Sequence, residues 1–328
     1  MATPTPLKAL VGGLCIPIAA HELLLLNGNV FGISGFIHRA VKGSVEGLAG
    51  AIGLAFSGLL ISNLETSGPA YLSLSLPKIL LSGLLVGLGT KLANGCTSGH
   101  MICGVSRFSV RSIAATVTFF TAGVITTQVV HKDLPVVGQA EWSVGADSYK
   151  LLAIQIIPLS ISLILYALTP DSKAKTAEKN SEEAPPSHNA LRVFTYLATA
   201  FQFGLALRLS NMTEASRVLS FLLLPFHPGF DPSLALVAAG ALPVGIFLYQ
   251  FARGGERARL GGKWSIPNGG KIDSRLLIGS TIFGVGWGMG GICPGPALVN
   301  FGRALGSGHG LVPYAAWLGS MVLGGLLV

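Results

Sequence analysis

Two cysteines interrupt apolar segments of this sequence and are the residues best suited to chemistry. Cys96 follows Asn-Gly and precedes Thr-Ser-Gly-His, whereas Cys293 opens the run Cys-Pro-Gly-Pro. Consecutive small residues destabilise a helix because glycine loses much conformational entropy, and proline stops an incoming helix. Backbone amides freed inside a bilayer need partners, which a water-filled cavity or a bound anion can supply. We therefore expect both breaks to line a cavity, with a polarizable thiol at each.

The two breaks resemble each other, which predicts a degenerate internal repeat of the inverted kind found in transporters. Each unit has a basic residue, an apolar half-helix containing Gly-x-Gly, a cysteine and a second basic residue. The aligned pairs are Lys78 and Arg275, Gly87 and Gly284, Gly89 and Gly286, and Cys96 and Cys293, followed by Arg107 and Arg303. Packing alone explains most isolated buried cysteines. The repetition favours a function for this pair.

The composition indicates a membrane protein. Half of the 328 residues are hydrophobic and only 11% are charged, whereas soluble domains carry about 25% charged residues. Several apolar segments approach the ~20 residues that cross a bilayer, and others are shorter. We expect an all-α polytopic membrane protein, with two pseudo-repeated halves made of full-span helices and re-entrant or broken half-helices.

The distribution of polar residues predicts the organisation of the chain. Residues 169–189 are almost free of apolar side chains, which is typical of a flexible linker. The predicted units are a first membrane half at 1–169, a linker at 170–190 and a second membrane half at 191–328. Loop 253–275 holds six Lys or Arg and two Asp or Glu, which predicts a cytoplasmic location in a multi-pass protein of the cell membrane. The net charge of +8 does not indicate nucleic-acid binding, because the basic residues lie in loops between apolar segments.

Several further residues are candidates for the site. His100 could donate to an anion or cap a broken helix, and Cys103 could be an auxiliary thiol or a packing residue. Arg107 and Arg303 could form an electropositive vestibule, although interfacial arginines often extend to the membrane surface without such a role. Within the first apolar segment, His21 and Glu22 are ionisable, which suggests a function or a mutual pair. The remaining candidates for contact with substrate are Gly95, Ser98, Gly295 and Ser34.

Three strings resemble the YeeE/YedE sulfur-transport family: GISG at 32–35, NGCTSGHMICGVSRFSVRS at 94–112 and FGVGWGMGGICPGPAL at 283–298. The chain looks like a fusion of two half-size members joined by the linker. The resemblance implies a helical transporter of thiosulfate or a related sulfur anion, passed without covalent change between the thiols of Cys96 and Cys293. In one departure, Gly32 stands where similar thiosulfate importers have a cysteine, so sulfide, a persulfide and other sulfur anions remain alternatives.

Two other functions compete with transport of a sulfur anion. One is a membrane thiol oxidoreductase or sulfurtransferase that uses Cys96 and Cys103, but their spacing differs from the usual C-x-x-C. The other is a soft-metal transporter with Cys96, His100 and Cys103 as ligands, but Cys293 has no comparable neighbours. We therefore predict no enzymatic activity, no metal and no cofactor. The expected partners are a small inorganic sulfur anion and the lipid bilayer, and the sequence does not determine the oligomeric state.

Overall fold

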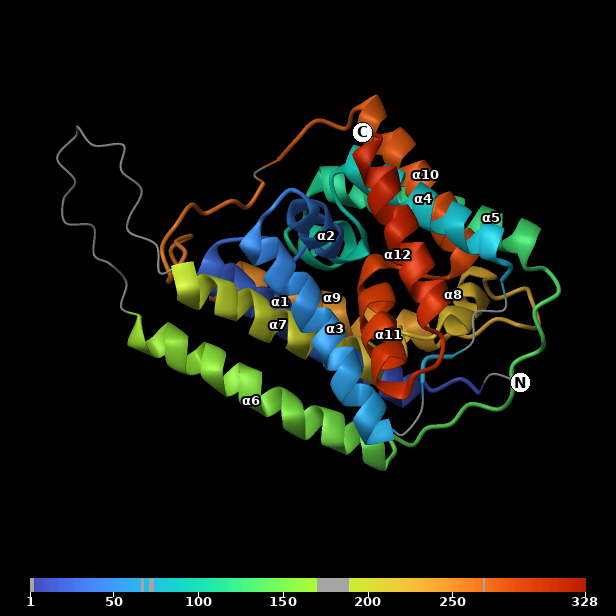
Figure 1. Cartoon of the computed structure of the whole chain (residues 1–328), viewed down its shortest axis with the longest axis horizontal. Coiled ribbons are helices and arrows are strands. Elements are labelled where there is room, and N and C mark those ends of the chain that lie inside the picture. Colours follow the sequence, from blue (N-terminus) through green and yellow to red (C-terminus); the bar gives the residue numbers. More distant parts are fainter. Residues whose placement is uncertain (1–2, 66–67, 71–73, 170–188, 268) are drawn as a thin grey trace.

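The computed structural model describes residues 3–65, 68–70, 74–169, 189–267 and 269–328, and all of its regular elements are helices (Figure 1). The predicted linker therefore lies almost wholly outside the described residues. The helices are α1 (Pro6–Asn27), α2 (Ile33–Val41), α3 (Val45–Glu65), α4 (Leu76–Ala93), the π-helix η1 (Ser98–Val105), α5 (Val110–Val130), α6 (Ala146–Leu168), α7 (Asn189–Leu209), α8 (Ala215–Leu222), α9 (Ser233–Ala252), α10 (Ser274–Gly290), α11 (Pro294–Ser307) and α12 (Leu311–Leu326).

Eight segments of the described chain are long and apolar enough to cross a membrane. Seven are the single helices α1, α3, α4, α5, α6, α7 and α9, and the eighth is Ser274–Ser307, which the break before Cys293 divides into α10 and α11. The short helices α2 and α8 and the π-helix η1 are too short to span a bilayer. The predicted all-helical fold with full-span and broken helices is confirmed.

Local sequence signals set several helix boundaries. Pro6 opens α1, where its fixed φ suits a first turn and its missing N–H costs nothing. Gly28 ends the same helix at a φ of 68° and returns its N–H to the carbonyl of Leu24. Asp273 caps α10 by accepting a hydrogen bond from the Leu276 N–H at 2.8 Å. This backbone hydrogen bond lowers the pKa of Asp273, so the cap stays ionised at neutral pH.

The two halves of the chain pack into each other and are related by an inverted symmetry. Helix α1 packs along α9 and α3 along α7, while α4 packs along α12 and α10 along α5. At the centre, α1 contacts α7 and α4 contacts α10. Asn27, at the end of α1, donates to the Arg192 carbonyl near the start of α7, and Asn211, beyond the end of α7, donates to Thr5 before α1. Helices α1 and α7 are thus antiparallel, as an inverted repeat requires.

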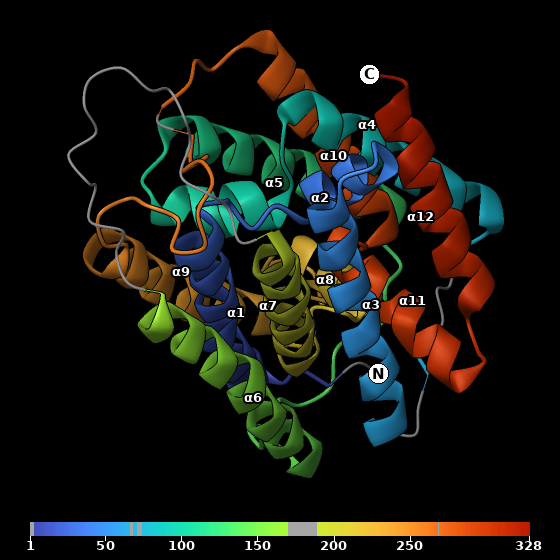
Figure 2. The same ribbon diagram turned by 60° about the vertical axis from the view of Figure 1, so that its left-hand side comes forward.

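Glycines bring the central helices into close contact, as small residues do in membrane proteins. A Cβ at Gly89 of α4 would overlap the backbone of Phe283 on α10, and a Cβ at Gly279 of α10 would lie 2.9 Å from the Gly89 carbonyl oxygen. Helix α6 has no counterpart in the second half and lies at the edge of the bundle against α7 and α1 (Figure 2).

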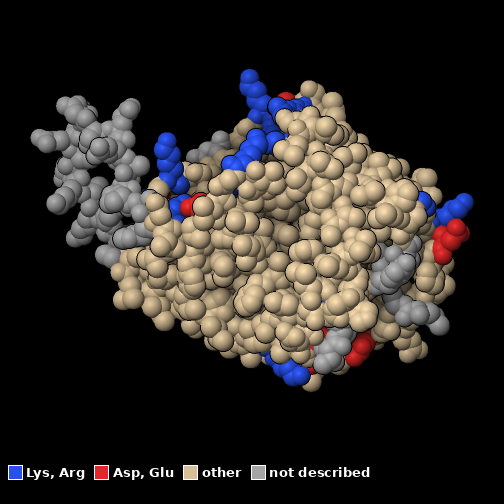
Figure 3. All heavy atoms as spheres, in the orientation of Figure 1, with Lys and Arg blue, Asp and Glu red and all other residues tan. Residues whose placement is uncertain are grey.

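Charged side chains concentrate at two opposite margins of the molecule, and the broad band between them shows none on the face in Figure 3. One end, which includes loop 253–275, is strongly basic. Its described Lys and Arg residues are Arg39, Lys42, Lys91, Arg107, Arg111, Arg192, Arg253, Arg257, Arg259, Lys263, Lys271 and Arg275, against Glu46, Glu256 and Asp273. The opposite end carries basic and acidic residues in nearly equal number. The predicted cytoplasmic location of the loop agrees with this asymmetry.

Candidate functional site

The first break joins α4 to the π-helix. Asn94 ends α4 in the left-handed region, at a φ of 56°, and returns its N–H to the Thr90 carbonyl. Cys96 follows with only 2% of its surface exposed, and its Sγ lies 3.4 Å from the Ser98 hydroxyl. The same hydroxyl accepts the Ile33 N–H at 3.2 Å, from the start of α2. Ser98 therefore ties the Cys96 break to the short helix α2. π-Helical segments are rare and are frequent at functional sites.

His100 stabilises the broken end of α4. Its Nε2 lies 3.2 Å from the Ala93 carbonyl oxygen and its Nδ1 lies 3.2 Å from the Ser112 hydroxyl. Because a carbonyl only accepts, the proton belongs on Nε2 and the ring can be neutral with Nδ1 accepting from Ser112. The ring also contacts Gly95, where a Cβ would lie 2.7 Å from Nε2. The structure therefore gives His100 the contacts of a helix cap.

We expect Gly95→Ala to destabilise the protein by about 1–2 kcal/mol, the usual cost of leaving a buried polar group unsatisfied. The added methyl group would displace His100 from the Ala93 carbonyl. The apparent melting temperature of the purified protein in detergent measures this change. Gly99→Ala is the matched control, because a Cβ there meets nothing closer than the Gly32 Cα at 4.0 Å. Equal melting temperatures for the two variants would contradict the capping role.

The second break joins α10 to α11. Gly291 ends α10 at a φ of 67°, and Cys293 precedes α11 in an extended conformation. Pro294 and Pro296 carry no N–H, so Gly295 supplies the only backbone donor among the first three residues of α11. Cys293 is 3% exposed and receives a hydrogen bond from the Thr97 hydroxyl, with an Oγ1–Sγ distance of 3.7 Å. The structure thus brings together two breaks that lie 197 positions apart in the sequence.

Both cysteines line one cavity with a volume of about 430 Å³, which we call the chamber. Its wall is mainly apolar, with Ile33, Met101, Phe120, Phe203 and Leu207 among the residues that form it. The residues of the wall that carry polar or sulfur atoms in their side chains include the two cysteines, Thr97, Ser98, Thr116 and Trp287. The chamber therefore offers hydrogen-bond donors and sulfur atoms within an otherwise apolar enclosure.

Trp287 and Thr116 are chamber residues that the sequence reasoning missed. The indole Nε1 of Trp287 and the Thr116 hydroxyl are both buried and have no hydrogen-bond partner among the described residues. A buried donor without a partner is costly, so these two groups are the donors on chamber residues that are free to bind another molecule. Trp287 belongs to the Gly-x-Gly-Trp-Gly run before the second break, a signal that could have identified it. Thr116 gives no such signal, because threonine is common in membrane helices.

A second cavity of about 590 Å³ opens at the basic end of the bundle, and we call it the basic vestibule. Arg39, Lys91, Arg107 and Arg111 line it, together with Ser34, Gly95 and His100. Gly32 borders the vestibule, while its neighbour Ile33 borders the chamber. In the same way, Gly95 borders the vestibule and Cys96 borders the chamber. The start of α2 and the Cys96 break therefore lie between the vestibule and the chamber.

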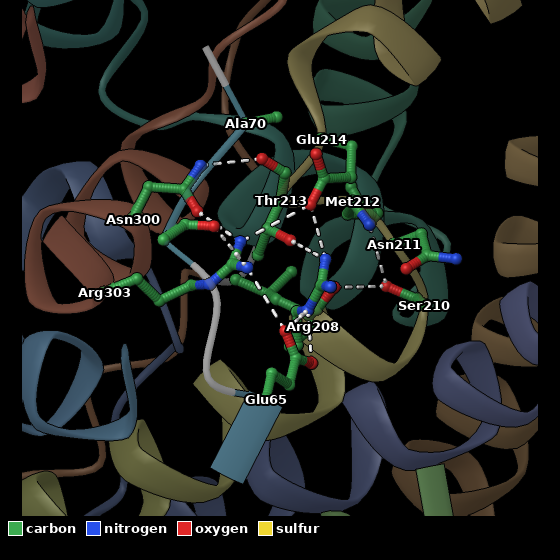
Figure 4. A network of polar contacts seen from close by, with 12 residues as sticks. Glu65, Ala70, Arg208, Ser210, Asn211, Met212, Thr213, Glu214, Asn300 and Arg303 are labelled. Carbon is green, nitrogen blue, oxygen red and sulfur yellow. Dashed lines mark hydrogen bonds and ion pairs between the residues drawn. The ribbon is translucent and has the colours of Figure 1, made fainter. Parts of the chain in front are cut away.

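Two predicted auxiliary residues lie away from the chamber. Cys103 lines a smaller cavity with Arg107, and its Sγ lies 3.9 Å from the Phe31 carbonyl oxygen. Arg303 lies in a buried ion-pair network at the opposite end of the bundle from the basic vestibule (Figure 4). It contacts Glu65 and Glu214, which also pair with Arg208. Arg107 does line the vestibule, whereas the charge of Arg303 is compensated by these carboxylates.

The alternative sites are less well assembled. Among the described residues, no group of three or more His, Cys, Asp or Glu side chains could hold a metal ion. All four cysteines are free thiols, and the ring of His100 is engaged by Ala93 and Ser112. Neither of the two alternative functions gains a ligand set or a disulfide from this arrangement.

Comparisons with known proteins place the chain among transporters. The family model described as "Sulphur transport" matches residues 34–126, and the model described as "Family of unknown function (DUF6691)" matches residues 191–328. Two proteins named "Probable transporter", from Xylella fastidiosa strains 9a5c and Temecula1, are each 39% identical over 120 residues. That alignment covers 36% of this chain and 89% of each relative. Another "Probable transporter" of strain 9a5c is 40% identical over 119 residues, covering 36% of this chain and 81% of the relative. No solved structure matches the chain with statistical significance.

Proposed function

The chain belongs to the sulphur transport (YeeE/YedE) family of membrane transporters, and from this premise we propose that it carries a small sulfur anion past the thiols of Cys96 and Cys293. The observation that supports this proposal best is the convergence of both buried thiols on one chamber. Because the two breaks belong to different halves of the chain, their meeting requires the whole inverted repeat to be folded.

The electrostatics of the basic vestibule suit an anion. Arg39, Lys91, Arg107 and Arg111 place positive charge around a cavity that reaches Gly95, the neighbour of Cys96. Clefts lined by one sign of charge raise the local concentration of the opposite ion. Between the vestibule and the chamber, the Cys96 thiol can contact a sulfur atom as a weak hydrogen-bond donor, with Ser98 beside it.

The chamber suits a small polarizable anion that carries oxygen atoms. The unpartnered Trp287 N–H and Thr116 hydroxyl can donate to oxygen, while Cys293 can contact sulfur. A sulfur oxyanion such as thiosulfate uses both kinds of contact, whereas sulfide uses only the thiols. In this scheme the anion moves by exchanging hydrogen bonds, and both cysteines remain thiols throughout.

Uptake of radiolabelled thiosulfate into proteoliposomes tests the proposal. Cys96→Ala and Cys293→Ala should each reduce the initial rate about tenfold or more, which corresponds to the loss of ~1.4 kcal/mol of stabilisation along the path. Cys15→Ala is the matched control, because Cys15 is a free cysteine on α1 that does not line the chamber. If both chamber variants transport at the rate of the control, the thiol path is wrong.

Comparing thiosulfate with sulfide in the same assay separates the contacts that the chamber makes to oxygen from those that it makes to sulfur. Trp287→Phe removes only the indole N–H and keeps a large aromatic side chain in the stack with Phe283. We expect this variant to slow thiosulfate uptake several-fold, as loss of a hydrogen bond worth about 1 kcal/mol does, and to leave sulfide uptake unchanged. Equal effects on the two substrates would show that the indole does not bind the oxygen atoms.

A further inference from the structure

A buried carboxyl group lies between three helices outside the proposed thiol path. Glu22 of α1 is 7% exposed, and its Oε1 accepts a hydrogen bond from the Gln202 amide of α7 at 2.9 Å. The Ser162 hydroxyl of α6 also hydrogen-bonds to the same carboxyl. His21, the neighbour of Glu22, is directed elsewhere, with its Nε2 3.3 Å from the Ala252 carbonyl oxygen. The mutual His21–Glu22 pair considered from the sequence is therefore not formed.

The Glu22–Gln202 pair lacks a hydrogen-bond donor for two of its oxygen atoms. Glu22 Oε2 and Gln202 Oε1 are both buried acceptors with no donor among the described residues. An ionised carboxylate only accepts hydrogen bonds, so it cannot satisfy either atom. A protonated carboxyl turns Oε2 into a donor and leaves a neutral group beside an amide oxygen that lacks one. A proton on Glu22 therefore supplies the donor that these two acceptors lack.

No cation compensates Glu22 in place of a proton, since Glu22 takes part in none of the ion pairs of the described residues. The nearby elements do carry charged or titratable groups, but these are engaged with other partners. Arg192 of α7 pairs with Glu46, Arg253 after α9 with Glu256, and Arg259 contacts Tyr166 of α6. Tyr249 of α9 lies under the Arg253 guanidinium. An isolated carboxylate in a membrane interior is expensive, so the neutral acid is the stable form.

The position of the pair connects it to the chamber. Phe203, which follows Gln202 on α7, and Ile16 of α1 both line the chamber wall. Ionisation of Glu22 would place an uncompensated charge in the α1–α7 contact and favour its opening to water. Any change that separates these helices would in turn favour loss of the proton, because binding and conformation are reciprocally linked.

We propose that Glu22 and Gln202 form a proton-binding site, and that one proton is bound and released there in each transport cycle. The proposal rests on the proposed transport of a sulfur anion. Glu22 holds the proton while the α1–α7 contact is closed, as in this structure. It releases the proton to water as a carboxylate when that contact opens, and takes up another on closing.

Infrared spectroscopy of the purified protein tests the proton directly. Wild-type protein at neutral pH should show the carbonyl-stretch band of a buried protonated carboxylic acid, and Glu22→Gln should lack it. Glutamine copies the shape and neutrality of the protonated side chain, so this variant should fold. Glu141→Gln, at an exposed loop position, is the control that should leave the band unchanged. Gln202→Leu keeps the acid but removes its hydrogen-bond partner, so it should shift the band. An identical band in wild type and Glu22→Gln would overturn the proton site.

Proteoliposomes with the membrane potential clamped at zero test the coupling. With one proton per anion, the thiosulfate accumulation ratio should rise about tenfold for each unit of imposed pH gradient, because one pH unit is a tenfold ratio of proton activity. Glu22→Gln should equilibrate thiosulfate without responding to the gradient, while Glu141→Gln behaves like wild type. Transport by wild type that ignores the gradient would overturn the coupling and leave the proposed function standing. Absence of any thiosulfate uptake by wild type would instead contradict the proposed function, and the infrared band would still decide whether Glu22 carries a proton.

Discussion

Arg303→Met is expected to destabilise the folded protein by about 3–5 kcal/mol, the usual cost of breaking a buried ion pair by removing one partner. Arg303 is only 2% exposed, and its guanidinium contacts Glu65 at 3.2 Å and Glu214 at 3.4 Å. It also donates to the Gly68 carbonyl at 2.9 Å. Without it, Glu65 and Glu214 would lose one of the two guanidinium groups that they share in this network (Figure 4), so negative charge would remain buried with less compensation.

Two further variants separate the loss of charge balance from the loss of side-chain packing. Combining Arg303→Met with Glu214→Gln restores neutrality and should recover a large part of the lost stability. Arg253→Met removes a partly exposed arginine that pairs with Glu256 at 3.2 Å, and should change stability by less than about 1 kcal/mol. Apparent melting temperatures in detergent compare all three. If the double variant is no more stable than Arg303→Met, charge balance is not what the network provides.

Gly302→Ala should destabilise the protein by about 3 kcal/mol or more, because overpacking of a tight helix contact forces backbones apart. A Cβ at Gly302 of α11 would overlap the carbonyl oxygen of Ala55 on α3, and Gly58 on α3 approaches Val299 of α11 in the same way. Since α11 begins directly after Cys293, separating these helices should also disturb the chamber.

The control for this prediction makes the same chemical change in another membrane helix. Gly319 of α12 has no atom within 4 Å of a Cβ position, so Gly319→Ala introduces no contact. Alanine favours a helix over glycine by about 1 kcal/mol, so this variant should be as stable as wild type or slightly more stable. The two substitutions should therefore change the melting temperature in opposite directions. A fall of similar size in both would mean that the α3–α11 contact is not the cause.

The sequence by itself determined the features that depend on neighbouring residues. The apolar segments establish an all-helical membrane protein, because bilayer spans need long runs of apolar residues. The Gly, Asn and Pro residues around Cys96 and Cys293 establish that the helices break there, since their backbone preferences act locally. The alignment of the two breaks established the repeat, and the resemblance of their motifs established the family.

Only the tertiary structure decided which distant residues meet. Helix α1 packs along α9 and α3 packs along α7, so segments more than 140 positions apart in the sequence lie side by side, and no local preference encodes this pairing. The pairing of the two halves brings Cys293 to Thr97 and leaves Cys103 outside the chamber. Arg107 and Arg303 occupy similar positions in the repeat, yet one lines a vestibule and the other is buried among carboxylates. The unpartnered atoms of Trp287 and Glu22 appear only when every neighbour is in place, because an unsatisfied hydrogen bond is a property of the packed environment.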